Sequence, residues 1–155
     1  ALTKSNVLAE DKLFATLDTT TRALFINGTK VGVLSDTVGF IQDLPHHLIE
    51  AFKSTLSELA YADLLLQVID ISDPNWEDHI KIVHQILEDL KVEKQMLYVF
   101  NKADKALYTT DELEVFAQRY QPHVIITATS QDGIKPLVDF LGAWHKERTV
   151  QVSPA

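Results

Sequence analysis

The stretch that decides the fold is Met96-Leu97-Tyr98-Val99-Phe100-Asn101-Lys102-Ala103-Asp104, in which an apolar run passes directly into a polar loop. A nearly continuous apolar run of this length is typical of a strand that is buried on both faces of a parallel sheet. In such sheets, ligands bind beyond the carboxyl ends of the strands. The polar residues after Phe100 are therefore candidates for binding a ligand, because packing alone gives no reason for them there.

Similar runs flank this strand on both sides along the chain. Residues 63–70 end at Asp70, and residues 124–127 lead into another short polar loop. The segments between the runs carry apolar side chains at helical spacing, with Asp73 and Thr110 as candidate N-caps and a closing helix over Ile134–Trp144. Alternating strands and helices predict an α/β fold with parallel pairing, right-handed crossovers and helices on both faces of the sheet.

Two earlier segments have different patterns. Arg22–Asn27 and Thr29–Asp36 flank the dipeptide Asn27-Gly28, which readily supplies the two positive-φ positions of a tight turn. We therefore expect an antiparallel hairpin there. Residues 45–59 begin with a proline and carry apolar side chains at helical spacing, which predicts a further helix.

The composition is that of one ordinary folded domain. The chain has 155 residues, a hydrophobic fraction of 46% and a charged fraction of 23%, which are typical of globular proteins. A net charge of −8 at pH 7 opposes independent binding to DNA or to an anionic membrane surface. No apolar run approaches the roughly 18 residues that cross a bilayer. The absence of cysteine fits a reducing compartment, so we expect a cytoplasmic domain without membrane insertion.

The loop Asn101-Lys102-Ala103-Asp104 has the residue types that can recognise guanine. Guanine presents two adjacent donors, N1–H and the 2-amino group, and one carboxylate such as that of Asp104 can accept from both. Adenine lacks these donors and would leave the carboxylate unpaired in a dry pocket, which is how a polar site discriminates strongly. Asn101 can tie neighbouring loops together, and the stem of Lys102 can cover the flat face of the base. The alternative is a polar loop that only ends the strand.

Three weaker patterns accompany this loop, and each also fits an ordinary turn. Asp36-Thr37-Val38-Gly39 follows a predicted strand, so its carboxylate could hold Mg²⁺ through water and its glycine N–H could meet a terminal phosphate. Phe14-Ala15-Thr16-Leu17-Asp18 opens a threonine-rich stretch, in which one hydroxyl could complete a Mg²⁺ shell. Thr127-Ala128-Thr129 is small and polar, which suits a close approach of backbone to a base oxygen.

Together these motifs resemble the guanine-nucleotide-binding domain of translation-factor-related P-loop GTPases, and most closely the HflX family of ribosome-associated GTPases. The resemblance covers about Leu2 to Leu141. It is carried by Phe14-Ala15-Thr16-Leu17-Asp18, by Asp36-Thr37-Val38-Gly39-Phe40-Ile41, by Leu44-Pro45-His46 with the segment 50–56, and by Asn101-Lys102-Ala103-Asp104. The first two stretches and the Leu-Pro-His sequence are typical of this family rather than of GTPases in general.

The resemblance implies a Ras-like three-layer α/β sandwich that binds GTP, GDP and Mg²⁺ and works at the large ribosomal subunit, in translation, ribosome rescue or biogenesis. It implies that Thr16 is a Mg²⁺ ligand, that Asp36 holds the ion through water and that Gly39 senses the γ-phosphate. Asn101 and Asp104 would read guanine, and Thr127–Thr129 would back the base. The GTP-binding segments would also include Phe14, Ala15, Leu17, Asp18, Thr37, Val38, Lys102 and Ala103. Phe40 stands where many GTPases carry a water-orienting glutamine, so we name no catalytic residue.

One expected motif is absent from this sequence. The phosphate loop needs G-x-x-x-x-G-K-[ST], and the five glycines of the chain do not supply it. The resemblance begins just downstream of the place where that loop would end. We therefore expect residues 1–147 to be a GTP-binding domain truncated before its first strand and phosphate loop, with residues 148–155 as a tail. Such a fragment should bind nucleotide weakly or not at all.

The absent strand would lie between the strands that end at Asp36 and Asp70. We expect either that Val31–Asp36 moves across to pair with Leu64–Asp70, or that a gap about one strand wide remains between them. In the second case the segment 2–13 should be displaced.

Two other functions compete with GTP binding. One is a non-enzymatic interaction fragment. The other is a receiver-like phosphoacceptor domain, since Asp36, Asp70 and Lys102 stand at predicted strand ends. Asp104 and the Phe14–Asp18 stretch oppose the receiver interpretation, because a receiver has no use for a guanine-reading carboxylate.

Overall fold

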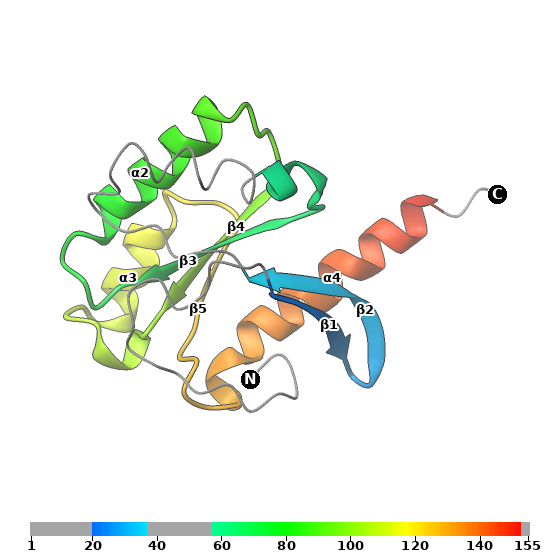
Figure 1. Cartoon of the computed structure of the whole chain (residues 1–155). Coiled ribbons are helices and arrows are strands. Elements are labelled where there is room, and N and C mark those ends of the chain that lie inside the picture. The colour runs from blue at the N-terminus through cyan, green and yellow to red at the C-terminus, as the bar shows by residue number, and fades with distance from the viewer. Residues whose placement is uncertain (1–19, 37–56, 153–155) are drawn as a thin grey trace.

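The computed structural model describes residues 20–36 and 57–152 of the chain (Figure 1). Five strands and three α-helices make up these ranges, joined in places by short 3-10 turns. In chain order they are β1 (Thr20–Ile26), β2 (Thr29–Asp36), η1 (Ser57–Tyr61), β3 (Leu65–Asp70), α2 (Trp76–Asp89), β4 (Met96–Asn101), η2 (Ala103–Lys105), α3 (Thr110–Ala117), β5 (His123–Ile125), η3 (Asp132–Ile134) and α4 (Lys135–Val152).

The predicted parallel unit is present. The strands β3, β4 and β5 form a parallel sheet in that order, with α2 and α3 on one face and α4 on the other (Figure 1). The central strand β4 is buried almost throughout, as its apolar run requires. Leu97 and Val99 are fully buried in the core on the α4 side, whereas Tyr98 and Phe100 are buried on the α2 and α3 side.

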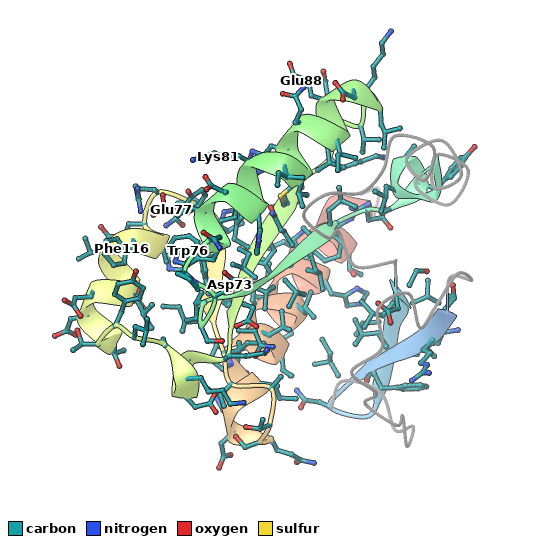
Figure 2. The ribbon with its side chains drawn as sticks, turned by 60° about the vertical axis from the view of Figure 1, so that its left-hand side comes forward. Asp73, Trp76, Glu77, Lys81, Glu88 and Phe116 are labelled. Atoms are coloured by element: carbon teal, nitrogen blue, oxygen red, sulfur yellow. The ribbon has the colours of Figure 1, made fainter. Side chains whose placement is uncertain are left out.

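Aromatic rings dominate the core between the sheet and the helices α2 and α3. Trp76 lies edge-on to Phe100, with ring centroids 5.6 Å apart, and 6.0 Å from Tyr120. Figure 2 shows Trp76 between the two helices, whereas Glu88 points away from them. Arg119 Nη2 lies 2.7 Å from Glu77 Oε1 and so joins the end of α3 to the start of α2.

The predicted hairpin is also present. The strands β1 and β2 pair antiparallel, and Asn27 and Gly28 turn the chain with φ values of 50° and 80°. Leu24 and Ile26 are buried in the core on the α4 side. A β-carbon placed on Gly142 of α4 would lie 3.6 Å from Ile26 Cγ2, so the hairpin packs closely against that helix.

The hairpin and the parallel sheet remain separate sheets. Of the two expected arrangements, the pairing of Val31–Asp36 with Leu64–Asp70 is therefore wrong for the described residues. The width of the gap between the two sheets stays a prediction, and the segment 2–13 lies outside the described residues. Side-chain burial against α4 explains how the hairpin is held without a shared ladder. Val68 in the middle of β3 is 64% exposed.

Three helix boundaries differ from the prediction. The helix α2 begins at Trp76 with Asn75 as N-cap and no side-chain cap, whereas the Asp73 carboxylate accepts from the Asn75 N–H at 2.8 Å in the turn just before the helix. The cap of α3 is Thr109 rather than Thr110, with Glu112 completing a capping box. The last helix continues past Trp144 to Val152. The predicted helix over residues 45–59 lies largely outside the described residues.

Side chains of α4 contact residues that lie just before β3 and β4. The Arg148 guanidinium lies 2.7 Å from Asp63 Oδ1 and 5.0 Å from the Trp144 ring centroid. Trp144 Nε1 donates to Gln95 Oε1 at 3.0 Å. No helix in the described part of the chain is long and apolar enough to span a membrane.

Candidate functional site

The carboxyl ends of the three parallel strands meet at one edge of the sheet. Asp70 stands directly opposite Asn101 in the β3–β4 register. The Ile71 N–H donates to the Asn101 carbonyl at 3.1 Å, and the Ile126 N–H donates to the Phe100 carbonyl at 2.8 Å. These backbone bonds continue beyond the strands and hold the three following loops side by side.

Asn101 links two of these loops through its side chain. Its Oδ1 accepts from the Ala128 N–H at 3.1 Å, which confirms the prediction that Asn101 ties neighbouring loops together. The Ala103 N–H also donates to the Ile126 carbonyl at 3.2 Å. The Asn101–Asp104 loop and the Thr127–Thr129 loop therefore form one hydrogen-bonded unit, although they are distant in sequence.

Lys102 has an unusual backbone conformation. Its φ of 64° lies in the left-handed region, and it is the N-cap of the 3-10 turn Ala103–Lys105. Such a positive φ is uncommon for a non-glycine residue. The turn carries Asp104 as an exposed carboxylate at the edge of the sheet.

The Lys102 ammonium is bound to a carboxylate on the neighbouring strand end. Lys102 Nζ lies 2.5 Å from Asp70 Oδ2, and Asp70 Oδ1 accepts from the Ser72 N–H at 3.0 Å and from the Ser72 hydroxyl at 2.6 Å. Partial burial alone would raise the pKa of Asp70. The hydrogen bonds from Lys102 and Ser72 and the charge of Lys102 outweigh that effect, so the pKa lies below its ordinary value of 3.8.

A glycine closes the Thr127–Thr129 loop. The Thr127 N–H donates to the Gly133 carbonyl at 3.0 Å, and the Gly133 N–H donates to Ser130 Oγ at 3.0 Å. A β-carbon at Gly133 would lie only 2.1 Å from the Thr127 carbonyl oxygen, so this close approach requires glycine. Sequence reasoning did not single out Gly133.

The predicted phosphate and metal residues are only partly described. Phe14–Asp18 and Thr37–Gly39 lie outside the described residues. Asp36 is the exposed last residue of β2, and no hydrogen bond or ion pair in residues 20–36 and 57–152 connects it to the Asn101–Asp104 loop. In the same ranges, no three acidic or histidine side chains are grouped to hold a metal ion.

The fold is an α/β domain in which polar loops gather at the carboxyl ends of a parallel sheet, the position at which ligands bind in folds of this kind. Comparison with known families identifies the class further, because the family described as 50S ribosome-binding GTPase matches residues 1–102. The chain belongs to this 50S ribosome-binding GTPase family.

The relatives of the chain include GTPases named HflX. The chain is 45% identical over 142 residues to GTPase HflX of Lacrimispora saccharolytica, covering 90% of this chain and 33% of that protein. It is 46% identical over 142 residues to that of Magnetococcus marinus, covering 90% and 32%. It is 37% identical over 153 residues to that of Chlamydia pneumoniae, covering 98% and 32%. The chain thus spans about a third of the length of these relatives. The predicted resemblance to HflX is confirmed.

A solved structure agrees with the fold. A crystal structure of a point variant of SsGBP superposes with a TM-score of 0.68 at 29% identity, covering 81% of this chain and 48% of that one. This likeness confirms the predicted α/β GTPase-type fold.

Proposed function

We propose that the chain is the guanine-reading part of a cytoplasmic GTPase that acts at the large ribosomal subunit. The observation that carries this proposal is the hydrogen bond from the Ala128 N–H to Asn101 Oδ1. It joins the two loops that would contact the base. Membership of the 50S ribosome-binding GTPase family supports the same function.

In this proposal each residue of the base site has a separate role. The exposed Asp104 carboxylate accepts the N1–H and 2-amino donors of guanine. Asn101 holds the Asn101–Asp104 loop against the loop after β5. The Lys102 stem covers the face of the base, and the Thr127–Thr129 backbone lies behind it. Adenine would leave Asp104 unpaired, which is the source of discrimination.

The residues for phosphate and Mg²⁺ are less complete in this sequence. Asp36 fits a Mg²⁺ site that works through water, because it is an exposed carboxylate at a strand end. Thr16 and Gly39 would contribute a hydroxyl ligand and a backbone N–H. The phosphate-loop pattern, which normally supplies the lysine and the N–H cradle for the phosphates, is not found in the sequence. We therefore assign GTP hydrolysis to a longer protein that also carries this motif, and we name no catalytic base.

Nucleotide titration tests the proposal. The protein to use is this chain extended at its N-terminus by the family's phosphate-loop segment, taken from the HflX of Lacrimispora saccharolytica. We expect it to bind fluorescent GTP and GDP and to discriminate against ATP. Equal binding of ATP and GTP would refute guanine recognition. Binding of neither nucleotide would favour an interaction fragment, and covalent labelling by acetyl phosphate would favour a phosphoacceptor.

A further inference from the structure

The carboxylate of Asp70 has no role in the proposed base site, yet it is bonded to a residue of that site. Its Oδ2 binds Lys102 Nζ at 2.5 Å, and its Oδ1 accepts two hydrogen bonds from Ser72. Both oxygens are therefore occupied, and the carboxylate is held from both sides.

This ion pair differs from the other lysine pairs described in the structure. Lys81–Asp78 and Lys135–Asp139 each lie within one turn of a single helix and are largely exposed. Such pairs have little effect on a distant site. The Asp70–Lys102 pair instead joins the ends of two strands, β3 and β4, whose register already places Asp70 opposite Asn101.

The pair determines the path of the Lys102 side chain. The backbone of Lys102 belongs to the loop after β4, and its ammonium group reaches the end of β3. The aliphatic stem must therefore run across the carboxyl edge of the sheet, between the two strand ends. A stem fixed there offers an apolar surface beside Asp104, on which a planar base can lie. An unfixed lysine would lose rotamer freedom when the base binds, which weakens binding.

We propose that Asp70 is a positioning residue for guanine recognition, which it assists by holding Lys102 across the edge of the sheet. This inference rests on the proposed function. Asp70 itself contacts no base in this scheme, and it acts only through Lys102. Ser72 orients the Asp70 carboxylate.

Whether a charge-removing substitution at Asp70 raises or lowers nucleotide affinity distinguishes a positioning role from a purely electrostatic one. Removing a negative charge near the site would by itself strengthen the binding of an anionic nucleotide. Loss of positioning would weaken it. A charge-removing substitution at Asp70 that lowers nucleotide affinity therefore supports positioning against the electrostatic trend.

The test is a double-mutant cycle for GDP binding by calorimetry at fixed ionic strength, in the extended chain described above. We expect Asp70→Asn to weaken GDP binding two- to fivefold, equivalent to about 0.4–1 kcal/mol at 1.4 kcal/mol per tenfold. In a Lys102→Met background the same substitution should cause no further loss. Asp139→Asn, which removes the acid of a matched lysine pair on α4, should leave the affinity unchanged. Thermal unfolding of each variant identifies any that is poorly folded.

Several outcomes would overturn the inference. Unchanged or tighter GDP binding by Asp70→Asn would do so, as would an equal loss in the Lys102→Met background, which would show an effect not transmitted through the lysine. If Asp104→Asn abolishes the guanine preference while Asp70→Asn has no effect, only the positioning role fails. If the unsubstituted extended protein shows no guanine preference, the proposed function and this inference fail together.

Discussion

Replacing Gly133 by alanine should damage the Thr127–Thr129 loop and destabilise the domain. The added β-carbon would lie 2.1 Å from the Thr127 carbonyl oxygen and 2.8 Å from Ser130 Oγ, where ordinary contacts begin at 3.4 Å. The nearest atom belongs to the backbone, so rotation of a side chain cannot relieve the overlap. Either Gly133 or the backbone of Thr127 must move.

Three effects determine how much Gly133→Ala lowers the free energy of unfolding. Overpacking of this kind costs about 1–3 kcal/mol. Movement of either segment also weakens the hydrogen bond from the Thr127 N–H to the Gly133 carbonyl, at a net cost of about 1 kcal/mol. Alanine restricts the unfolded chain, which returns roughly 0.4–1 kcal/mol. We expect Gly133→Ala to lower the free energy of unfolding by about 1–3.5 kcal/mol.

Urea unfolding followed by circular dichroism measures this effect. With a typical m-value near 2 kcal/mol/M, the midpoint should fall by about 0.5–1.8 M. Gly32→Ala is the matched control, because no atom lies within 4 Å of a β-carbon at that position. It should leave the midpoint unchanged or raise it slightly. A fall of less than about 0.5 kcal/mol for Gly133→Ala, or an equal fall for both variants, would refute the steric argument.

Three further predictions concern the site. In the extended chain, Asp104→Asn should reduce the preference for guanine and improve binding of xanthine nucleotides, because the new amide donates to the xanthine C2 carbonyl. Competition titrations with GDP and XDP measure both effects. An unchanged guanine preference would remove Asp104 from its role. A polypeptide of residues 1–155 should show no Mg²⁺-dependent GTP binding at micromolar concentration in calorimetry, because base contacts alone do not neutralise the phosphates. Micromolar binding would require another phosphate site. Because the pKa of Asp70 is lowered in the folded state, its ionised form contributes stability above pH 3.8 that is lost as the pH falls through the lowered value. The stability difference between the unsubstituted chain and Asp70→Asn should therefore shrink as the pH falls through the lowered pKa, and a difference that stays constant or grows between neutral and acid pH in urea unfolding would contradict this.

The strands were predictable because their patterns are strong and local. The run Met96–Phe100 has a single good explanation, burial on both faces, and β4 meets that expectation. Asn27-Gly28 specifies a tight hairpin turn by its backbone preferences alone. The loop that follows β4 was predictable for the same reason, since a polar group at the end of a buried strand has no packing role.

The helix starts depended on competition between neighbouring polar groups. Asp73 has the right residue type for an N-cap and its carboxylate accepts from the Asn75 N–H, but the regular helix begins only at Trp76. Thr109 and Thr110 are equivalent by residue type. The structure favours Thr109 because Glu112 stands three residues further on and completes a capping box. That spacing was visible in the sequence.

The contacts that shape the site were not predictable from local pattern. Asp70 and Lys102 meet because β3 and β4 pair in one register, and a shift of that register would separate them. The role of Gly133 arises from the way the chain folds back onto Thr127. Sequence reasoning placed Asp70 and Lys102 together at predicted strand ends, but their ion pair followed only from the three-dimensional arrangement.

The predicted nucleotide site has two halves that are held in different ways. The base half consists of the Asn101–Asp104 and Thr127–Thr129 loops, and Asp36 is the described residue of the phosphate half. The base half stands on β4 and β5, and backbone and side-chain hydrogen bonds connect its loops directly. Asp36 of the phosphate half stands on the hairpin, which joins no ladder of the parallel sheet and is held by the packing of Leu24 and Ile26 on the α4 side. Hydrogen bonds fix direction and register, whereas apolar contacts are non-directional. Hydrogen bonds therefore fix the loops of the predicted base half relative to each other, whereas the position of Asp36 relative to them depends on how the hairpin packs against α4.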